Sequence, residues 1–127
     1  MNGNSITDDS TIGDNEVILR RIPKEWVIVD QNLKRKRPTS ACFQDGSKDP
    51  MSVYILSEAQ SPAAVMQGAK EPFLVALPVA FVRKLGLGII RDPSSGGPGH
   101  ALLVGKKTGA TKEKLAKAAA WVAPYGP

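Results

Sequence analysis

Short apolar runs separated by turn-forming residues dominate the pattern of this chain. Runs of five or six residues rich in β-branched and aromatic side chains are typical of strands. Such runs occur at 26–30 (WVIVD), 52–56 (SVYIL) and 100–105 (HALLVG), and a further apolar run occupies 73–77 (FLVAL). We expect weaker strands at 39–44 and 87–90. The segment 17–22 (VILRRI) begins apolar and turns basic, and it fits either a strand or a short helix.

Helices are expected where apolar residues recur every three or four positions behind a capping residue. Ser61 followed by Pro62 predicts a short helix, Pro78 predicts a second one, and Thr111 is expected to cap a final helix. Strands and helices alternate without a regular strand–helix–strand repeat. The sequence therefore predicts an α+β fold: a single small domain over 16–127 with a mainly antiparallel or mixed sheet, two or three short helices and a C-terminal helix.

The first 15 residues are polar and rich in turn formers, so we expect a disordered acidic tail at 1–15. Residues 1–16 contain four of the 12 Asp and Glu residues and none of the 17 Lys and Arg residues. Residues 17–127 therefore carry 17 positive charges against 8 negative ones. A field of this sign attracts acidic proteins, nucleic acids and phosphorylated small molecules.

Several classes of protein are disfavoured by features that the chain lacks. No window approaches 18 apolar residues, and the N-terminus does not have the pattern of a secretory signal, so we expect no membrane association. The only cysteine, Cys42, cannot form an intramolecular disulfide, and we expect a cytoplasmic protein. There is one histidine and no CxxC or HExxH motif, so the sequence indicates neither a metal site nor a cofactor.

The stretch 32–43 (NLKRKRPTSACF) is the first candidate for anion binding. Pro38 favours an extended conformation of Arg37, which we expect at the entrance of a strand over 39–44. A guanidinium beside the hydroxyl of Ser40 or Thr39 would form a compact set of donors for phosphate or carboxylate oxygens. The preceding cations are expected in an exposed loop, where they could equally be solvated: Lys34, Arg35 and Lys36.

A second basic cluster surrounds the start of the last helix. An anion lying there would meet both lysine side chains and free main-chain N–H groups. Lysine-rich helix ends are also common on protein surfaces, and that alternative remains open. The cluster includes Lys106, Lys107, Lys112 and Lys114.

His100 borders the glycine-rich segment 92–99 (DPSSGGPG), which we expect to be a flexible loop. A histidine at the start of a buried strand is commonly a hydrogen-bonded structural residue. The alternative is a general acid or base, because imidazole titrates near neutral pH. Cys42 lies within an apolar run, and we expect a buried thiol.

The segments ILRRIPKEW, RPTSACF, MSVYIL and GHALLVGKK, followed by LAKAAAWV, resemble a family of small bacterial proteins for which we know of no assigned activity. The resemblance covers 17–123. It implies a bacterial, cytosolic protein and carries over no activity, cofactor or site residue.

Three functions fit these observations. The first is a non-catalytic binding module whose basic face engages an acidic protein surface or a nucleic acid. The second is a small enzyme acting on a nucleotide or another phosphate-bearing substrate, with Arg37 and Ser40 as anion ligands and His100 as the acid or base. The third is an antitoxin-like or structural subunit that contacts a partner through an exposed edge at 17–22 or 73–77.

Overall fold

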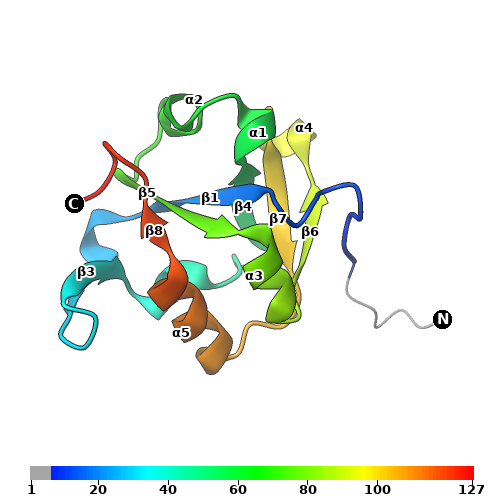
Figure 1. Ribbon diagram of the computed structural model, residues 1–127. Coiled ribbons are helices and arrows are strands. Elements are labelled where there is room, and N and C mark those ends of the chain that lie inside the picture. The colour runs from blue at the N-terminus through cyan, green and yellow to red at the C-terminus, as the bar shows by residue number, and fades with distance from the viewer. Residues whose placement is uncertain (1–6) are drawn as a thin grey trace.

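Six antiparallel strands form one sheet through the middle of the molecule (Figure 1). The computed structural model describes residues 7–127. Along the sheet the strand order is β6-β7-β4-β1-β5-β8. The strands are β1 Val17–Ile22, β4 Met51–Ile55, β5 Phe73–Pro78, β6 Gly88–Arg91, β7 His100–Val104 and β8 Ala120–Trp121. Two further strands, β2 Val27–Asp30 and β3 Arg35–Pro38, form a separate hairpin.

Short helices cover both faces of this sheet (Figure 1). Helices α1 and α2 lie on one face, and α3 and α5 lie on the other. The predicted α+β class is therefore confirmed. The helical elements are η1 Lys24–Trp26, η2 Ser40–Phe43, α1 Leu56–Ala59, α2 Pro62–Met66, α3 Val79–Lys84, α4 Pro93–Gly96 and α5 Gly109–Ala118.

Alternation along the strands divides the apolar residues between the two faces. In β4, Met51, Val53 and Ile55 are buried in the main core, together with Phe43 of η2 and Leu115 of α5. The intervening β4 residues are exposed or half-buried. Because successive side chains of a strand point to opposite faces, these residues lie on the side of the sheet away from the main core.

A second, smaller core lies on the opposite side of the sheet. It consists of Leu19 and Leu74 from the sheet packed against Ala59 of α1 and Val65 of α2. The Ser61 side chain accepts a hydrogen bond from the Ala64 N–H, as the predicted cap requires. The two helices thereby bury the apolar residues that β1 and β5 present on this face.

The segment 39–44 does not form the strand that the sequence predicts. The β2–β3 pairing ends at Pro38, and residues Ser40–Phe43 turn into the single 3₁₀ turn η2. This turn places both Cys42 and Phe43 in the core, because α5 covers them. Cys42 is therefore buried as expected, although it lies on a helical turn instead of a strand.

Two smaller expectations also change. Helix α5 is capped by Thr108, whose Oγ1 accepts a hydrogen bond from the Thr111 N–H at 3.1 Å, so the cap lies three residues earlier than predicted. The segment 92–99 contains the helical turn α4. Strands β1 and β5 lie inside the sheet, each between two other strands, so neither 17–22 nor 73–77 is an edge strand, although β1 pairs with β4 only at Ile18 and Leu19.

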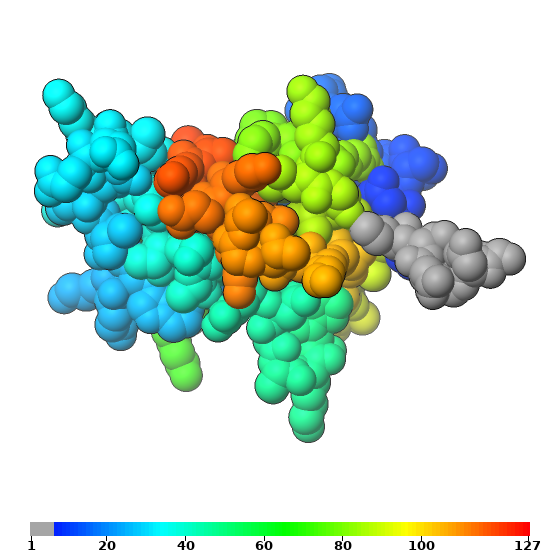
Figure 2. Space-filling view, turned by 90° about the horizontal axis from the view of Figure 1, so that it is seen from below, coloured from blue at the N-terminus to red at the C-terminus, as the bar shows by residue number. Residues whose placement is uncertain are grey.

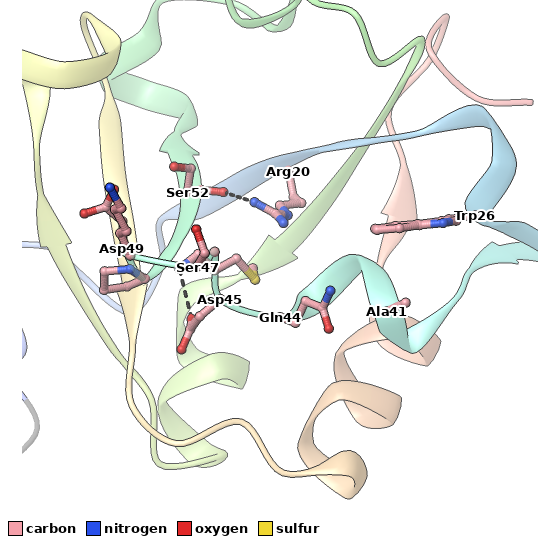
Figure 3. A pocket seen from close by; sticks show the side chains of 12 residues that line it. Arg20, Trp26, Ala41, Gln44, Asp45, Ser47, Asp49 and Ser52 are labelled. Atoms are coloured by element: carbon pink, nitrogen blue, oxygen red, sulfur yellow. Dashed lines mark hydrogen bonds between the residues drawn. The ribbon is translucent and has the colours of Figure 1, made fainter.

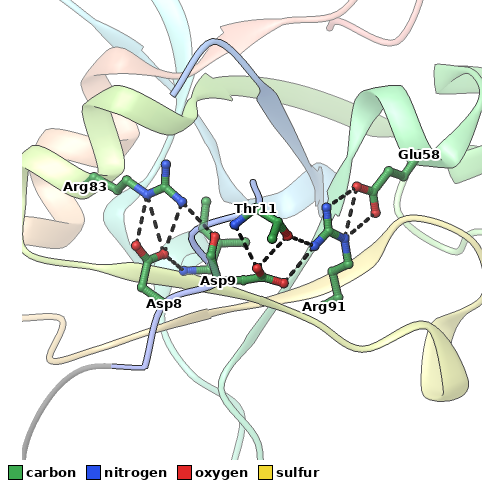
Figure 4. A network of polar contacts seen from close by, with 7 residues as sticks. Asp8, Asp9, Thr11, Glu58, Arg83 and Arg91 are labelled. Atoms are coloured by element: carbon green, nitrogen blue, oxygen red, sulfur yellow. Dashed lines mark hydrogen bonds and ion pairs between the residues drawn. The ribbon is translucent and has the colours of Figure 1, made fainter. Parts of the chain in front are cut away.

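Residues 7–15 pack along the edge of the sheet beside β6, where the composition predicts a disordered tail. Ile12 is 1% exposed and belongs to the main core. The Asp9 N–H donates to the Ile89 carbonyl at 2.8 Å, so the segment covers an otherwise unpaired strand edge. Asp9 also pairs with Arg91 at 2.7 Å, and Asp8 pairs with Arg83 (Figure 4). The remainder of the predicted tail, residues 1–6, lies outside the described residues.

Candidate functional site

The central sheet opens between β1 and β4. These strands pair only at Ile18↔Ile55 and Leu19↔Tyr54. Beyond Leu19, β1 stays paired with β5 through Ile22, and β4 stays paired with β7 down to Met51. Each strand thus follows its other neighbour, and a gap forms between residues 20–22 and 51–53.

Arg20 lies in this gap. Its Nη1 donates to the Ser52 carbonyl at 2.7 Å, and its Nε donates to the Cys42 carbonyl at 3.1 Å. If the two strands had stayed paired, backbone groups of β1 would have formed hydrogen bonds with backbone groups of β4. A side chain of β1 satisfies the Ser52 carbonyl instead, because a polar main-chain group that is removed from water needs a partner.

Arg21 approaches the same opening from the other face of the sheet. Its Nε and Nη2 donate to the Val65 carbonyl at 3.0 and 2.5 Å. Its guanidinium carbon lies 5.0 Å from the centre of the Tyr54 ring, within the range of a cation–π interaction. The carbonyl and the ring together hold the side chain in one position.

Neither Arg20 nor Arg21 forms an ion pair with a carboxylate among residues 7–127. Burial lowers the pKa of Arg20 from its ordinary value, and the surrounding Cys42, Glu71 and Asp45 act in the opposite direction. Arginine nevertheless stays charged in proteins. Two half-buried cations that have only neutral acceptors are favourable ligands for an anion.

His100 faces the same opening from β7. Its Nδ1 lies 2.8 Å from the Asp92 main-chain carbonyl, which can only accept a hydrogen bond. Nδ1 must therefore carry the proton, and the lone pair of neutral imidazole lies on Nε2. Nε2 is 3.1 Å from Ser52 Oγ, so the Ser52 hydroxyl donates to His100. The imidazole also packs against the Tyr54 ring in a T-shaped arrangement, with ring centres 5.3 Å apart.

The glycine-rich segment fixes the position of this imidazole. A β-carbon added to Gly96 would lie 2.3 Å from His100 Cγ, far closer than such atoms approach in proteins. Gly99 has a φ of +81° and packs against Ala59, where a side chain would collide with the main chain. Gly96 therefore lets the backbone pass directly over the histidine, and Gly99 lets it pass close to α1, which are structural reasons for these two glycines.

Together these residues line a cleft of about 520 Å³, within the range of small-molecule sites. A second hollow of about 490 Å³ adjoins it and shares Arg20, Trp26 and Ser52 (Figure 3). Figure 3 shows Arg20 between Ser52 and Trp26, a residue that is 39% exposed. Glu71 also lines the first cleft but forms no ion pair with either arginine.

Of the predicted site residues, only His100 lines this cleft. Arg37 is buried and pairs with Asp30 through Nε at 2.6 Å, with Glu113 at 3.6 Å on its other side. Ser40 lies in η2 and does not border the cleft. The predicted convergence of Arg37, Ser40 and His100 is therefore absent: Arg37 is held by Asp30 across the β2–β3 hairpin and by Glu113 of α5, and neither Arg37 nor Ser40 lines the cleft.

The remaining predicted cations divide into two groups. Lys107 has a side chain only 3% exposed, and its Nζ contacts Asp45 and the Leu103 carbonyl, each at 2.7 Å. It stabilises the end of β7 and is not free for a ligand. The others lie in the β2–β3 hairpin, before α5 or on α5, and they are exposed or half-buried: Lys34, Arg35, Lys36, Lys106, Lys112 and Lys114.

The hairpin and α5 lie against each other, so the two predicted basic clusters are neighbours in space. Arg35 Nη2 donates to the Lys117 carbonyl at 2.8 Å, and Trp121 Nε1 donates to the Lys36 carbonyl at 3.0 Å. Figure 2 shows the cyan hairpin and the orange helix α5 on one face of the molecule. We call this surface, formed by 34–36 and 112–117, the basic face.

The sequence argument missed Arg20, Arg21, Ser52 and Tyr54, which line the cleft with His100, and Asp92, whose carbonyl orients the imidazole. One signal was visible, namely two adjacent arginines within an apolar strand segment at 17–22. Neighbouring strand residues point to opposite faces, so at least one of those cations had to be directed towards the interior.

Within residues 7–127, no helix combines the length and the apolar character that crossing a bilayer requires. The same residues contain no group of three His, Cys, Asp or Glu side chains that could hold a metal ion. Comparisons of the chain with protein-family models, curated protein sequences and solved structures gave no match. The resemblance to small bacterial proteins thus stays a prediction.

Proposed function

We propose that this protein is a small enzyme that acts on a nucleotide or another phosphate-bearing substrate in the cleft between β1 and β4. The observation that carries the proposal is the convergence of Arg20, Arg21 and His100 on one opening. Guanidinium groups suit phosphate oxygens, and both arginines lack carboxylate partners among residues 7–127. His100 is the acid or base, because the ring is held with Nε2 directed at the Ser52 hydroxyl.

Trp26 supports a substrate that carries an aromatic base. Its half-exposed indole lines both hollows beside Arg20. An aromatic ring stacked on an exposed indole gains about 1–3 kcal/mol. A nucleotide would place its base against Trp26 and its phosphate between the two arginines.

Thermal unfolding in the presence of ligands tests this function. Inorganic phosphate and adenosine monophosphate should raise the melting temperature, because a ligand that binds only the native state stabilises it. Adenosine without phosphate should have a much smaller effect. Arg21→Gln should abolish the shift, whereas Lys36→Gln, an exposed cation outside the cleft, should leave it unchanged. Equal shifts in the two variants, or none in the wild type, would refute the proposal.

The basic face supports a second candidate, the non-catalytic binding module that engages an acidic protein surface or a nucleic acid. Its specific support is the docking of the hairpin on α5, which gathers Lys34, Lys36 and Lys114 on one surface. Binding to a nucleic acid through these residues should weaken steeply with salt. A Lys34→Gln, Lys114→Gln double variant should lower the affinity for single-stranded DNA and reduce its salt dependence. Arg21→Gln should leave both unchanged.

A cytoplasmic location is part of the same proposal. Cys42 is free and buried, so nothing among residues 7–127 depends on an oxidising compartment. Fractionation of the producing cells would test it.

A further inference from the structure

We propose that Ser52 is the covalent nucleophile of this cleft and that it attacks the phosphorus atom of the substrate while His100 accepts its proton. This inference rests on the proposed function and names its reaction: phosphoryl transfer through a phosphoserine intermediate. Neither the composition nor any motif of the sequence indicates it.

The first support is the direction of the hydrogen bond between Ser52 and His100. The Asp92 carbonyl fixes the proton on Nδ1, so the Nε2 lone pair at 3.1 Å is the acceptor for the Ser52 hydroxyl. A serine hydroxyl becomes a nucleophile when an adjacent base is positioned to take its proton, and a third group orients that base. Here the orienting group is the Asp92 main chain.

The second support is accessibility. Ser52 is exposed and borders both hollows, whereas His100 is buried beneath Gly96. A substrate can therefore reach the serine oxygen, while the imidazole behind it is shielded from bulk water. The Asp92 carboxylate lies 3.6 Å from His100 Nδ1, where it attracts the positive charge that the ring acquires with the proton.

The third support is the position of Arg20. Its guanidinium is bonded to the carbonyl of Ser52 itself, at 2.7 Å, so a cation lies beside the reacting residue. Phosphoryl transfer spreads negative charge over the equatorial oxygens, and fixed donors stabilise that charge. Arg20 lines the same cleft as Ser52, and we assign it as a donor to those oxygens.

The reaction balances without a further reactant except water. Ser52 Oγ forms a bond to phosphorus, the bond from phosphorus to the leaving oxygen breaks, and the Ser52 proton passes through His100 to that oxygen. In the second step His100 takes a proton from water, the hydroxide attacks phosphorus, and the Oγ–phosphorus bond breaks. The proton returns to Ser52, and inorganic phosphate leaves.

Ser95 provides a matched control within the same cleft. It also lines the opening, but its hydroxyl donates to the Asp92 carboxylate and not to an imidazole. The Ser95 hydroxyl proton is held by the Asp92 carboxylate, and Ser95 lacks the hydrogen bond to His100 that Ser52 has. Ser95 is therefore a serine of similar surroundings and exposure that should not be activated.

A fluorophosphonate reports an activated serine directly, because the attacking oxygen displaces fluoride from phosphorus. Mass spectrometry of the labelled wild-type protein should find the adduct on the Ser52 peptide and none on Ser95. The Ser95→Ala variant should react like the wild type, and Ser52→Ala should not react. His100→Gln should slow the labelling at least a hundredfold, the lower end of the contribution of a general base.

Three results would overturn the proposal: no adduct on Ser52, labelling of Ser95 at the same rate, or equal rates in wild type and His100→Gln. The comparison of Ser52 with Ser95 uses only wild-type protein, so it remains valid if His100→Gln fails to fold. Melting curves of the wild-type protein with inorganic phosphate separate this inference from the proposed function on which it rests. Stabilisation by phosphate without labelling of Ser52 refutes only the nucleophile, whereas the absence of stabilisation refutes the anion site itself.

Discussion

The contact between Gly96 and His100 gives the sharpest prediction about this site. A β-carbon at Gly96 would lie 2.3, 2.4 and 2.8 Å from His100 Cγ, Cδ2 and Cβ. Ordinary van der Waals contact begins near 3.4 Å. In Gly96→Ala, the ring and the α4 turn must therefore separate by about 1 Å, because packed interiors have no room for overlap.

A movement of this size cannot preserve both hydrogen bonds of the imidazole, which are 2.8 Å to the Asp92 carbonyl and 3.1 Å to Ser52 Oγ. Overpacking costs about 1–3 kcal/mol. Loss of one hydrogen bond adds about 0.5–1.5 kcal/mol. We therefore expect Gly96→Ala to lower the free energy of unfolding by roughly 1.5–4.5 kcal/mol and to slow the labelling of Ser52.

Gly109→Ala is the matched control, since it makes the same substitution in the first turn of α5. A β-carbon at Gly109 would meet nothing within 4 Å. Its stability should be unchanged or raised by up to about 1 kcal/mol, because alanine restricts the unfolded chain. Urea denaturation and fluorophosphonate labelling of both variants test the argument. Equal stability and equal labelling rates for Gly96→Ala and wild type would show that the glycine does not position the histidine.

Three further predictions concern the fold. Ile12→Ala should lower the free energy of unfolding by about 2–5 kcal/mol in urea, because Ile12 is fully buried; a loss below about 0.5 kcal/mol would mean that residues 7–15 do not pack on the sheet. Burial raises the pKa of the Cys42 thiol, so iodoacetamide should alkylate native protein much more slowly than urea-unfolded protein, and equal rates would contradict this. Hydrogen bonding by Arg37 lowers the pKa of Asp30 below 3.8, so the stability that this carboxylate contributes should be complete above that pH and be lost as the pH falls through the lowered value. Asp30→Asn should reduce the acid dependence measured by urea denaturation, and an unchanged dependence would show that the pair does not contribute.

Local pattern was sufficient to locate most of the elements. The strands around 52–56 and 100–105 and the helix behind Ser61 form close to where the apolar periodicity places them. Such features depend on neighbours within a few residues, and these are visible in the chain. The segment at 39–44 shows the limit of that reasoning. Its composition suits a strand, but it forms a helical turn because α5, more than 60 residues later, buries Cys42 and Phe43.

The tail and the first anion site differ from the prediction for the same reason. Composition alone makes 1–15 look disordered, yet Asp8 and Asp9 meet Arg83 and Arg91 across more than 70 positions in the chain. Arg37 has the sequence surroundings of an anion ligand, but Asp30 already neutralises it across the hairpin. A charge count shows how many cations exist and not which of them have found a partner.

The sequence by itself determined an α+β domain with a basic surface, one buried thiol and a single histidine beside a glycine-rich segment, because composition and local periodicity encode those properties. Only the tertiary structure decided where β1 and β4 part, and hence that Arg20, Ser52 and His100 share a cleft. The physical reason is that strand pairing is settled by packing between residues 30 to 80 positions apart. A cleft at the point where two strands diverge has no signature in either strand alone.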